Sequence, residues 1–156
     1  MRNTFRILKV KIKETSKGED IFMEWETKSE NGWERQTLKS TDVPRPELYS
    51  AMRVMGLHAL KMCELKHTED DMPEYWQAGE VNIKYNDDVP CRFLVIKASV
   101  PVRYGYDFSF KTPAWAVTDD ARNLQADVNT LADEAMRYIS GDRAQGKLNL
   151  EGAANE

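Results

Sequence analysis

The stretch that decides the fold is residues 45–65, RPELYSAMRVMGLHALKMCEL. Its apolar side chains recur at intervals of four and three residues, which places them on one face of a helix. They are Leu48, Met52, Met55, Ala59 and Met62. Pro46 suits the first helical turn, where its missing N–H is not needed. Because the apolar face has to be buried, we expect a core helix with strands before and after it.

Two segments with alternating side chains precede this helix and predict half-buried strands. Residues 8–13 alternate apolar side chains with lysines, and residues 23–26 alternate apolar side chains with glutamates. If the loop between them centres on Lys17-Gly18, charge and hydrophobicity agree on one antiparallel register. The expected pairs are Lys9–Glu26, Val10–Trp25, Lys11–Glu24 and Ile12–Met23.

Asn31-Gly32 predicts a two-residue hairpin turn, because both residues tolerate a positive φ angle. The turn leads into a third strand, residues 33–39, and sets Trp25 beside Leu38 on the core face. Trp33 then falls on the opposite face, where it is a candidate contact residue for a partner.

The second half of the chain repeats strands followed by a helix. Residues 81–85 alternate, and residues 92–102 are nearly all apolar, as in a central strand covered on both faces. Residues 104–110 carry four aromatic side chains on one face, and we expect this face to pack in the core. The four are Tyr104, Tyr106, Phe108 and Phe110. We expect a second helix to begin near Thr118 or Asp119. Its apolar face carries Ala121, Leu124, Val128, Leu131, Ala135 and Tyr138.

This order predicts an α+β fold: an antiparallel sheet with two helices on one face, in the order βββα-βββα. We expect residues 1–140 to form a single domain. Gly141 ends the second helix, and residues 141–156 are small and polar without periodicity. We therefore interpret 141–156 as a flexible C-terminal tail.

The amino-acid composition bears on the size of the domain, on nucleic-acid binding and on membrane contact. The 156 residues are 41% hydrophobic, which suits one domain with a substantial core. A net charge of −4 argues against tight nucleic-acid binding. No apolar run approaches the ~18 residues that cross a membrane, and the N-terminus lacks the apolar core of a signal peptide. With only two cysteines, Cys63 and Cys91, the chain fits a reducing cytoplasm, and we expect no membrane contact.

Motifs of catalysis are not found in the sequence. It contains no phosphate-cradling glycine loop, no HExxH, no GxSxG and no paired CxxC. His58, Cys63 and His67 do not have the spacing of a zinc site. We therefore expect a protein that is not an enzyme, with no catalytic residues, no cofactor and no metal.

The chain resembles a group of phage proteins, mainly in its first half. The hairpin that leads into DVPRPELYSAM (42–52), with the helix closing in MCEL (62–65), is similar to small uncharacterised proteins encoded among the early or recombination genes of tailed bacteriophages. The resemblance covers about residues 20–65 and a helix followed by Arg143 to Gln145. It implies a phage or prophage origin, a cytoplasmic location in the bacterial host and an accessory role near DNA replication or recombination.

The tail carries a second resemblance. Gln145, Leu148 and Leu150 in QGKLNL resemble the short peptide by which bacterial replication proteins dock on the sliding clamp. Such a peptide lays one glutamine and two apolar side chains into a preformed groove. Glu151 departs from the pattern, which has phenylalanine at that position. The resemblance implies the clamp as a partner.

Two functional hypotheses follow. The first is a non-enzymatic accessory protein that acts by protein–protein interaction near DNA replication or recombination, through Trp33 or the tail, on a host or phage protein. The sequence is also compatible with a homodimer. The alternative is an anti-defence protein that inhibits a host nuclease or sequesters a nucleotide signal in a pocket lined by Arg103, Tyr104 and Tyr106.

Overall fold

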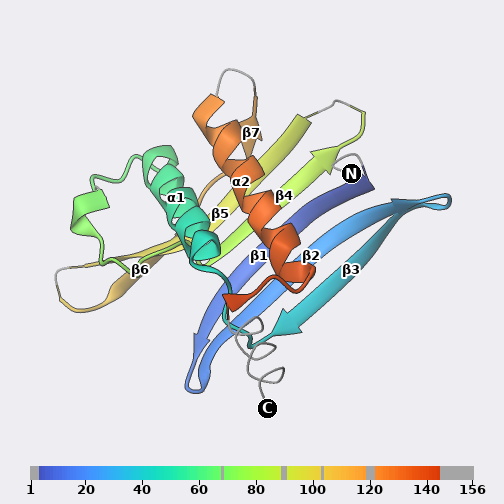
Figure 1. Cartoon of the computed structure of the whole chain (residues 1–156). Coiled ribbons are helices and arrows are strands. Elements are labelled where there is room, and N and C mark those ends of the chain that lie inside the picture. Colours follow the sequence, from blue (N-terminus) through green and yellow to red (C-terminus); the bar gives the residue numbers. More distant parts are fainter. Residues whose placement is uncertain (1–3, 68, 89–90, 103, 119–121, 145–156) are drawn as a thin grey trace, which may run out of the picture.

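A computed structural model describes residues 4–67, 69–88, 91–102, 104–118 and 122–144 (Figure 1). The strands are β1 (Phe5–Thr15), β2 (Gly18–Ser29), β3 (Gly32–Ser40), β4 (Glu80–Asn86), β5 (Cys91–Pro101), β6 (Asp107–Lys111) and β7 (Trp115–Val117). The helices are α1 (Pro46–Met62) and α2 (Arg122–Ile139), with a short 3-10 turn η2 (Glu69–Asp71). Within these ranges the sheet order is β3-β2-β1-β4-β5-β6, and β7 also pairs with β5.

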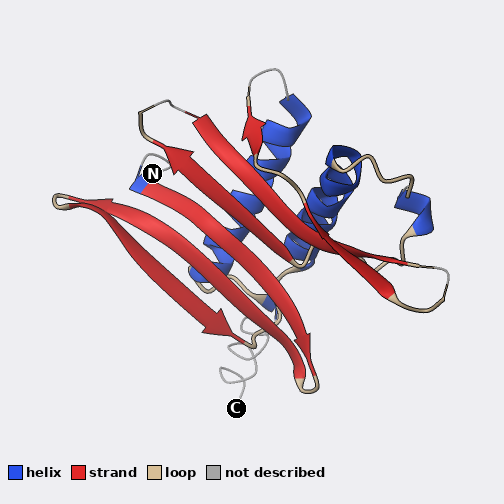
Figure 2. Cartoon of the chain, turned by 180° about the vertical axis from the view of Figure 1, so that it is seen from behind, coloured by secondary structure: helices blue, strands red, loops and turns tan. Residues whose placement is uncertain are grey.

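The predicted α+β class is confirmed, with an antiparallel sheet and both helices on one face (Figures 1 and 2). The expected order βββα-βββα is wrong, because the second half contributes four strands to the described sheet. After β6, the Thr112 N–H donates to the Ile96 carbonyl at 2.9 Å, and the chain then pairs with β5 again as β7. A three-residue strand carries too short an alternation to be recognised in the sequence.

The two helices bury the faces that their spacing predicts. On α1, the side chains of Leu48, Met52, Met55 and Ala59 are at most 1% exposed, and Met62 is half-buried. On α2, the buried residues are Leu124, Val128, Leu131, Ala135 and Tyr138. Ala121 lies outside the described residues. Neither helix is long and apolar enough, over its described residues, to cross a bilayer.

Both N-terminal hairpins differ from the expected register by two residues. Val10 pairs with Met23 rather than Trp25, and Trp25 pairs with Gln36 rather than Leu38. In each hairpin the glycine follows the turn instead of forming its centre: Thr15 pairs with Gly18, and Ser29 pairs with Gly32. The same shift applies to the other three residues of β1 for which a partner was expected, which form the pairs Lys9–Glu24, Lys11–Phe22 and Ile12–Ile21.

The physical reason is the backbone conformation of these glycines. Gly18 has a φ angle of 125° and Gly32 one of 106°, values that side chains with a Cβ rarely adopt. The hydroxyls of Thr15 and Ser29 close the turns, since each donates to the carbonyl of its paired glycine, at 2.9 and 3.3 Å. A turn followed by a glycine in this conformation is the next most common hairpin geometry after the two-residue turn.

Two expectations for the second half are also wrong. β5 is buried on one face only, through Leu94, Ile96, Ala98 and Val100, because nothing described covers the other face. Of the four aromatic residues expected in the core, only Phe110 packs against it. Tyr104 and Tyr106 are exposed because they lie at the hairpin tip beyond Val100, the last residue of β5 that joins the core. Phe108 pairs with Val100 but is 52% exposed, because it lies on the edge strand of the described sheet.

Candidate functional site

The sheet divides at the start of β4. Gly79 bridges its neighbours: its carbonyl accepts from the Ile12 N–H and its N–H donates to the Lys97 carbonyl, both at 3.0 Å. β4 begins at Glu80, so beyond Gly79 no described strand joins β1 to β5. From there the β1–β2 and β5–β6 hairpins project in different directions (Figure 1). The notch between them is an open cavity of about 1290 Å³, which α1 and residues 73–79 also line.

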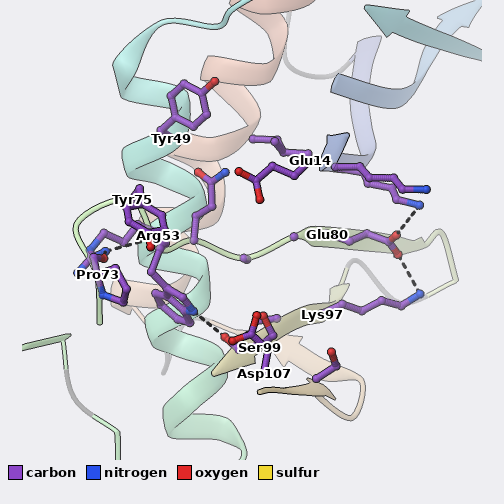
Figure 3. Close-up of a pocket in the computed structure, with 18 of the residues that line it drawn as sticks. Glu14, Tyr49, Arg53, Pro73, Tyr75, Glu80, Lys97, Ser99 and Asp107 are labelled. Carbon is purple, nitrogen blue, oxygen red and sulfur yellow. Dashed lines mark hydrogen bonds and ion pairs between the residues drawn. The ribbon is translucent and has the colours of Figure 1, made fainter. Parts of the chain in front are cut away.

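Arg53 fixes one wall of the notch (Figure 3). Its guanidinium, which projects from α1, donates to the carbonyls of Pro73, Glu74 and Trp76 at 2.6, 3.2 and 3.0 Å. The Trp76 ring nitrogen in turn donates to the Ser99 carbonyl at 2.6 Å. Arg53 therefore holds the connection between α1 and β4 in place, and its donors are occupied by the chain itself.

Two titratable groups of the notch have shifted pKa values. The Tyr49 hydroxyl donates to Glu19 at 2.6 Å, and burial, followed by this hydrogen bond and the negative charge of Glu19, raises the pKa of Tyr49 well above its usual value. Burial of Glu80 would raise its pKa, but hydrogen bonds from Asn82 and Lys97 outweigh burial and lower it. At neutral pH Tyr49 is therefore protonated and Glu80 ionised, so neither is poised to exchange a proton.

The face of the sheet that the helices leave uncovered (Figure 2) carries a row of lysines, which follows from the strand pairing. Strand pairing aligns one residue from each of six strands, over about 24 Å at the usual strand spacing. From β3 to β6 the row is Lys39, Phe22, Lys11, Glu80, Lys97 and Lys111. Glu80, only 7% exposed, lies within 3.1 Å of the Lys97 ammonium and 3.8 Å of the Lys11 ammonium. The row is thus basic but partly neutralised at its centre.

The exposed apolar side chains gather along one edge of the sheet. Among the described residues, seven large hydrophobic side chains are exposed, and five of them lie between positions 102 and 115. We call these five the aromatic edge: Val102, Tyr104, Tyr106, Phe108 and Trp115, which are 39%, 81%, 74%, 52% and 41% exposed. The sequence pattern marked three of them as one face of a strand but assigned that face to the core.

The predicted contact residue Trp33 pairs with Lys28 on the neighbouring strand. It is half-buried, because the Arg6 guanidinium stacks 3.9 Å from the centre of its ring. Trp33 lines a second, smaller cavity of about 540 Å³, together with Tyr85 and Arg92. Its ring is therefore already in contact with a cation of the same chain.

The other predicted site residues do not meet in a pocket. Tyr104 and Tyr106 lie at the tip of the β5–β6 hairpin and line neither of the two cavities. Arg103, Gln145, Leu148 and Leu150 lie outside the described residues.

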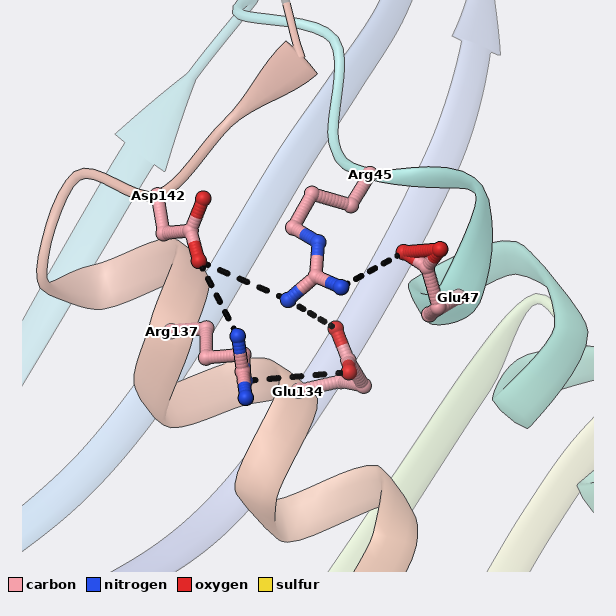
Figure 4. A network of polar contacts seen from close by, with 5 residues as sticks. All are labelled: Arg45, Glu47, Glu134, Arg137 and Asp142. Atoms are coloured by element: carbon pink, nitrogen blue, oxygen red, sulfur yellow. Dashed lines mark hydrogen bonds and ion pairs between the residues drawn. The ribbon is translucent and has the colours of Figure 1, made fainter. Parts of the chain in front are cut away.

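Residues 142–144, which the sequence analysis assigned to the tail, are held against the start of α1 (Figure 4). Asp142 accepts from Arg45 at 3.4 Å and from Arg137 at 3.3 Å, and Glu134 lies 3.7 Å from the same Arg45 group. Arg45 also pairs with Glu47 at 2.9 Å. The network joins the end of α2 to the start of α1.

A scan of protein-family models and searches of curated proteins and of solved structures gave no match to this chain.

Proposed function

We propose that this is a non-enzymatic accessory protein that acts by protein–protein interaction, near DNA replication or recombination in a bacterial host. The observation that supports the proposal is the aromatic edge. Exposed apolar side chains scattered singly are normal on a protein surface, whereas a group of them is typical of an interaction site. Four of the five, Val102 to Phe108, lie within the β5–β6 hairpin, and Trp115 lies further along the same side of β5. The place of this interaction in DNA metabolism rests on the resemblance of residues 20–65 to phage early-region proteins.

The chemistry of the edge fits recognition of a protein. Tyrosine, tryptophan and phenylalanine are enriched at protein interfaces, because each combines a large contact area with few rotatable bonds. The same edge ends in β6, whose outer side has no strand beside it in the described sheet. Unpaired backbone groups of an edge strand accept an extended segment of a partner as an added strand.

Site-specific photo-crosslinking tests this proposal. A photoreactive phenylalanine analogue replaces Tyr106 in one variant, and replaces Thr37 on the opposite edge strand β3 in the control. After irradiation of bacterial host cells, we expect a covalent product with a protein from position 106 and none from position 37. No product from position 106, or equal products from both positions, would contradict the proposal.

A second candidate function is sequestration of a nucleotide signal, and the notch is the observation that favours it. Lys11, Lys97 and Lys111 line the notch, and ammonium groups are common partners of phosphate. If the notch binds nucleotides, a cyclic dinucleotide or ATP raises the melting temperature of the wild type. The shift should disappear in Lys97→Ala/Lys111→Ala and persist in Lys84→Ala, which removes an exposed lysine outside the notch. If neither the cyclic dinucleotide nor ATP raises the melting temperature of the wild type, this candidate function is excluded.

A further inference from the structure

β6 is a free edge strand with unusual chemistry. In the described sheet it pairs with β5 alone, so its other side presents backbone donors and acceptors to solvent. The opposite edge strand, β3, is polar over most of its length and carries three charged side chains, Glu34, Arg35 and Lys39. Charged side chains on an edge strand are one way in which proteins protect it from pairing. β6 instead carries Phe108 and Phe110 between one acidic and one basic residue.

The sequence of β6 is complementary to itself. It reads Asp107-Phe108-Ser109-Phe110-Lys111. When two copies pair antiparallel about a two-fold axis at Ser109, Asp107 of one copy lies opposite Lys111 of the second copy. Phe108 then lies opposite Phe110 of the second copy. Opposite charges and aromatic pairs directly across two strands both stabilise a sheet, and a two-fold axis supplies each pair twice.

The charges of β6 have no partner of opposite sign among the residues that the structure describes. Lys111 lies opposite Lys97 across the β5–β6 pair, and Asp107 lies opposite Pro101. Neither Asp107 nor Lys111 forms an ion pair with another described residue. A second copy in this register supplies both with an opposite charge.

The apolar side chains point to the same register. Phe108 and Phe110 lie on the face that packs against the helices, opposite Val100 and Ala98, and Phe108 is 52% exposed. The second copy would cover Phe108 with its own Phe110. Extending the register by one pair places Thr112 opposite Tyr106 of the second copy. The exposed Tyr106 at the end of the hairpin thereby reaches the segment that follows β6.

We propose that the protein forms a two-fold dimer in which β6 pairs with β6 of a second copy, so that the two sheets become one continuous antiparallel sheet. This inference rests on the proposed function, because it names the partner of the aromatic edge. The dimer explains why the edge of β6 is free, why its charges lack partners and why Phe108 and Tyr106 are exposed. Because the paired strands are short, the interface belongs to the small class, and the expected dissociation constant is about 10 µM.

Sedimentation velocity of the purified full-length protein tests the dimer, from about 1 to 200 µM around the expected constant. The wild type should pass from the 18.0 kDa monomer to twice that mass. Asp107→Lys places lysine opposite lysine at both symmetric pairs, and it should raise the dissociation constant about tenfold. Lys111→Asp should do the same. The double variant Asp107→Lys/Lys111→Asp restores opposite charges and should dimerise within about threefold of the wild type.

Glu34→Lys on β3 is the matched control and should leave the dissociation constant unchanged. A wild type that stays monomeric over the whole range, or an Asp107→Lys variant that dimerises like the wild type, would overturn the dimer. If position 106 still cross-links to a different protein while the purified chain is monomeric, the proposed function stands and only the dimer fails. If position 106 gives no product with any protein, the proposed function fails with it.

Discussion

Arg53 is the side chain on which the shape of the notch depends most. It links α1 to residues 73–76 by three hydrogen bonds from a charged group to backbone carbonyls. Helical spacing gives no sign of this role, because the partner carbonyls lie 16 to 23 residues away in the sequence. Contacts of this kind depend on the path of a loop, which alternation and helical spacing do not predict.

Replacing Arg53 with methionine tests this role. The variant keeps much of the aliphatic stem but removes the donor to the carbonyls of Glu74 and Trp76, whereas the Pro73 carbonyl still accepts from the Trp76 N–H. We expect a loss of roughly 2–4 kcal/mol in the free energy of unfolding. Denaturant titration measures the loss, and Arg35→Met, an exposed arginine on β3, is the control. A loss no larger than that of the control would show that the connection holds its path without Arg53.

The buried tyrosines predict how stability depends on alkaline pH. Burial raises the pKa of Tyr49, Tyr85 and Tyr138 above 10.0 in the folded protein. Above pH 10 the unfolded chain releases these protons while the folded chain keeps them, so the free energy of unfolding falls as the pH rises.

Tyr49→Phe removes one of the three groups, and it should make the decline between about pH 10 and pH 12 shallower. Chemical denaturation at several pH values measures the slope. Tyr75→Phe is the control, since Tyr75 is 85% exposed. A slope for Tyr49→Phe that equals the wild-type slope would contradict the assignment of Tyr49.

At the scale of elements, the helices were predicted well because helical spacing is a local property. The residues every three and four positions along α1 and α2 are the ones that the sheet covers. The hairpin registers depended on whether glycine forms the turn or follows it, and Asn31-Gly32 is compatible with both. Tyr104 and Tyr106 are exposed because α1 does not pack over the end of the β5–β6 hairpin, and alternation does not predict how far along a strand a helix packs. Alternation identifies a face of a strand but not what packs on it.

Gly56 marks the closest approach of α1 to the connection that follows it. A Cβ atom at this position would lie 2.6 and 2.8 Å from atoms of the Trp76 ring. Trp76 is 8% exposed and its ring nitrogen is bonded to Ser99, so the ring has little room to move. We therefore expect Gly56→Ala to cost roughly 1–3 kcal/mol of stability.

Thermal denaturation followed by tryptophan fluorescence measures this cost. Gly79→Ala is the matched control, because the nearest atom to its Cβ would be 3.9 Å away. If both variants melt at the same temperature, the contact between α1 and Trp76 is looser than described.

For the whole molecule, the distribution of charge matters more than its sum. The net charge is −4, yet the uncovered face of the sheet carries the row of four lysines. Glu80 neutralises the centre of the row, and Lys9 is paired with Glu24 beside it.

We therefore predict no binding to single- or double-stranded DNA tighter than about 1 µM at physiological salt. Fluorescence anisotropy with labelled oligonucleotides measures the affinity. Tighter, salt-sensitive binding that is lost in Lys9→Glu/Lys11→Glu would show that the face is a nucleic-acid site.

If the protein meets its partner, a second copy, at the β6 edge, dimerisation protects that edge and leaves the opposite edge, β3, unchanged. Hydrogen–deuterium exchange compares the two edges of the same sheet directly. Between about 1 and 200 µM protein, a range chosen around the expected dissociation constant, outward amides of Asp107–Lys111 should exchange several-fold more slowly at the high concentration. Amides of Gly32–Ser40 should not change. Exchange at β6 that is independent of concentration, or protection that is equal at both edges, would contradict the account.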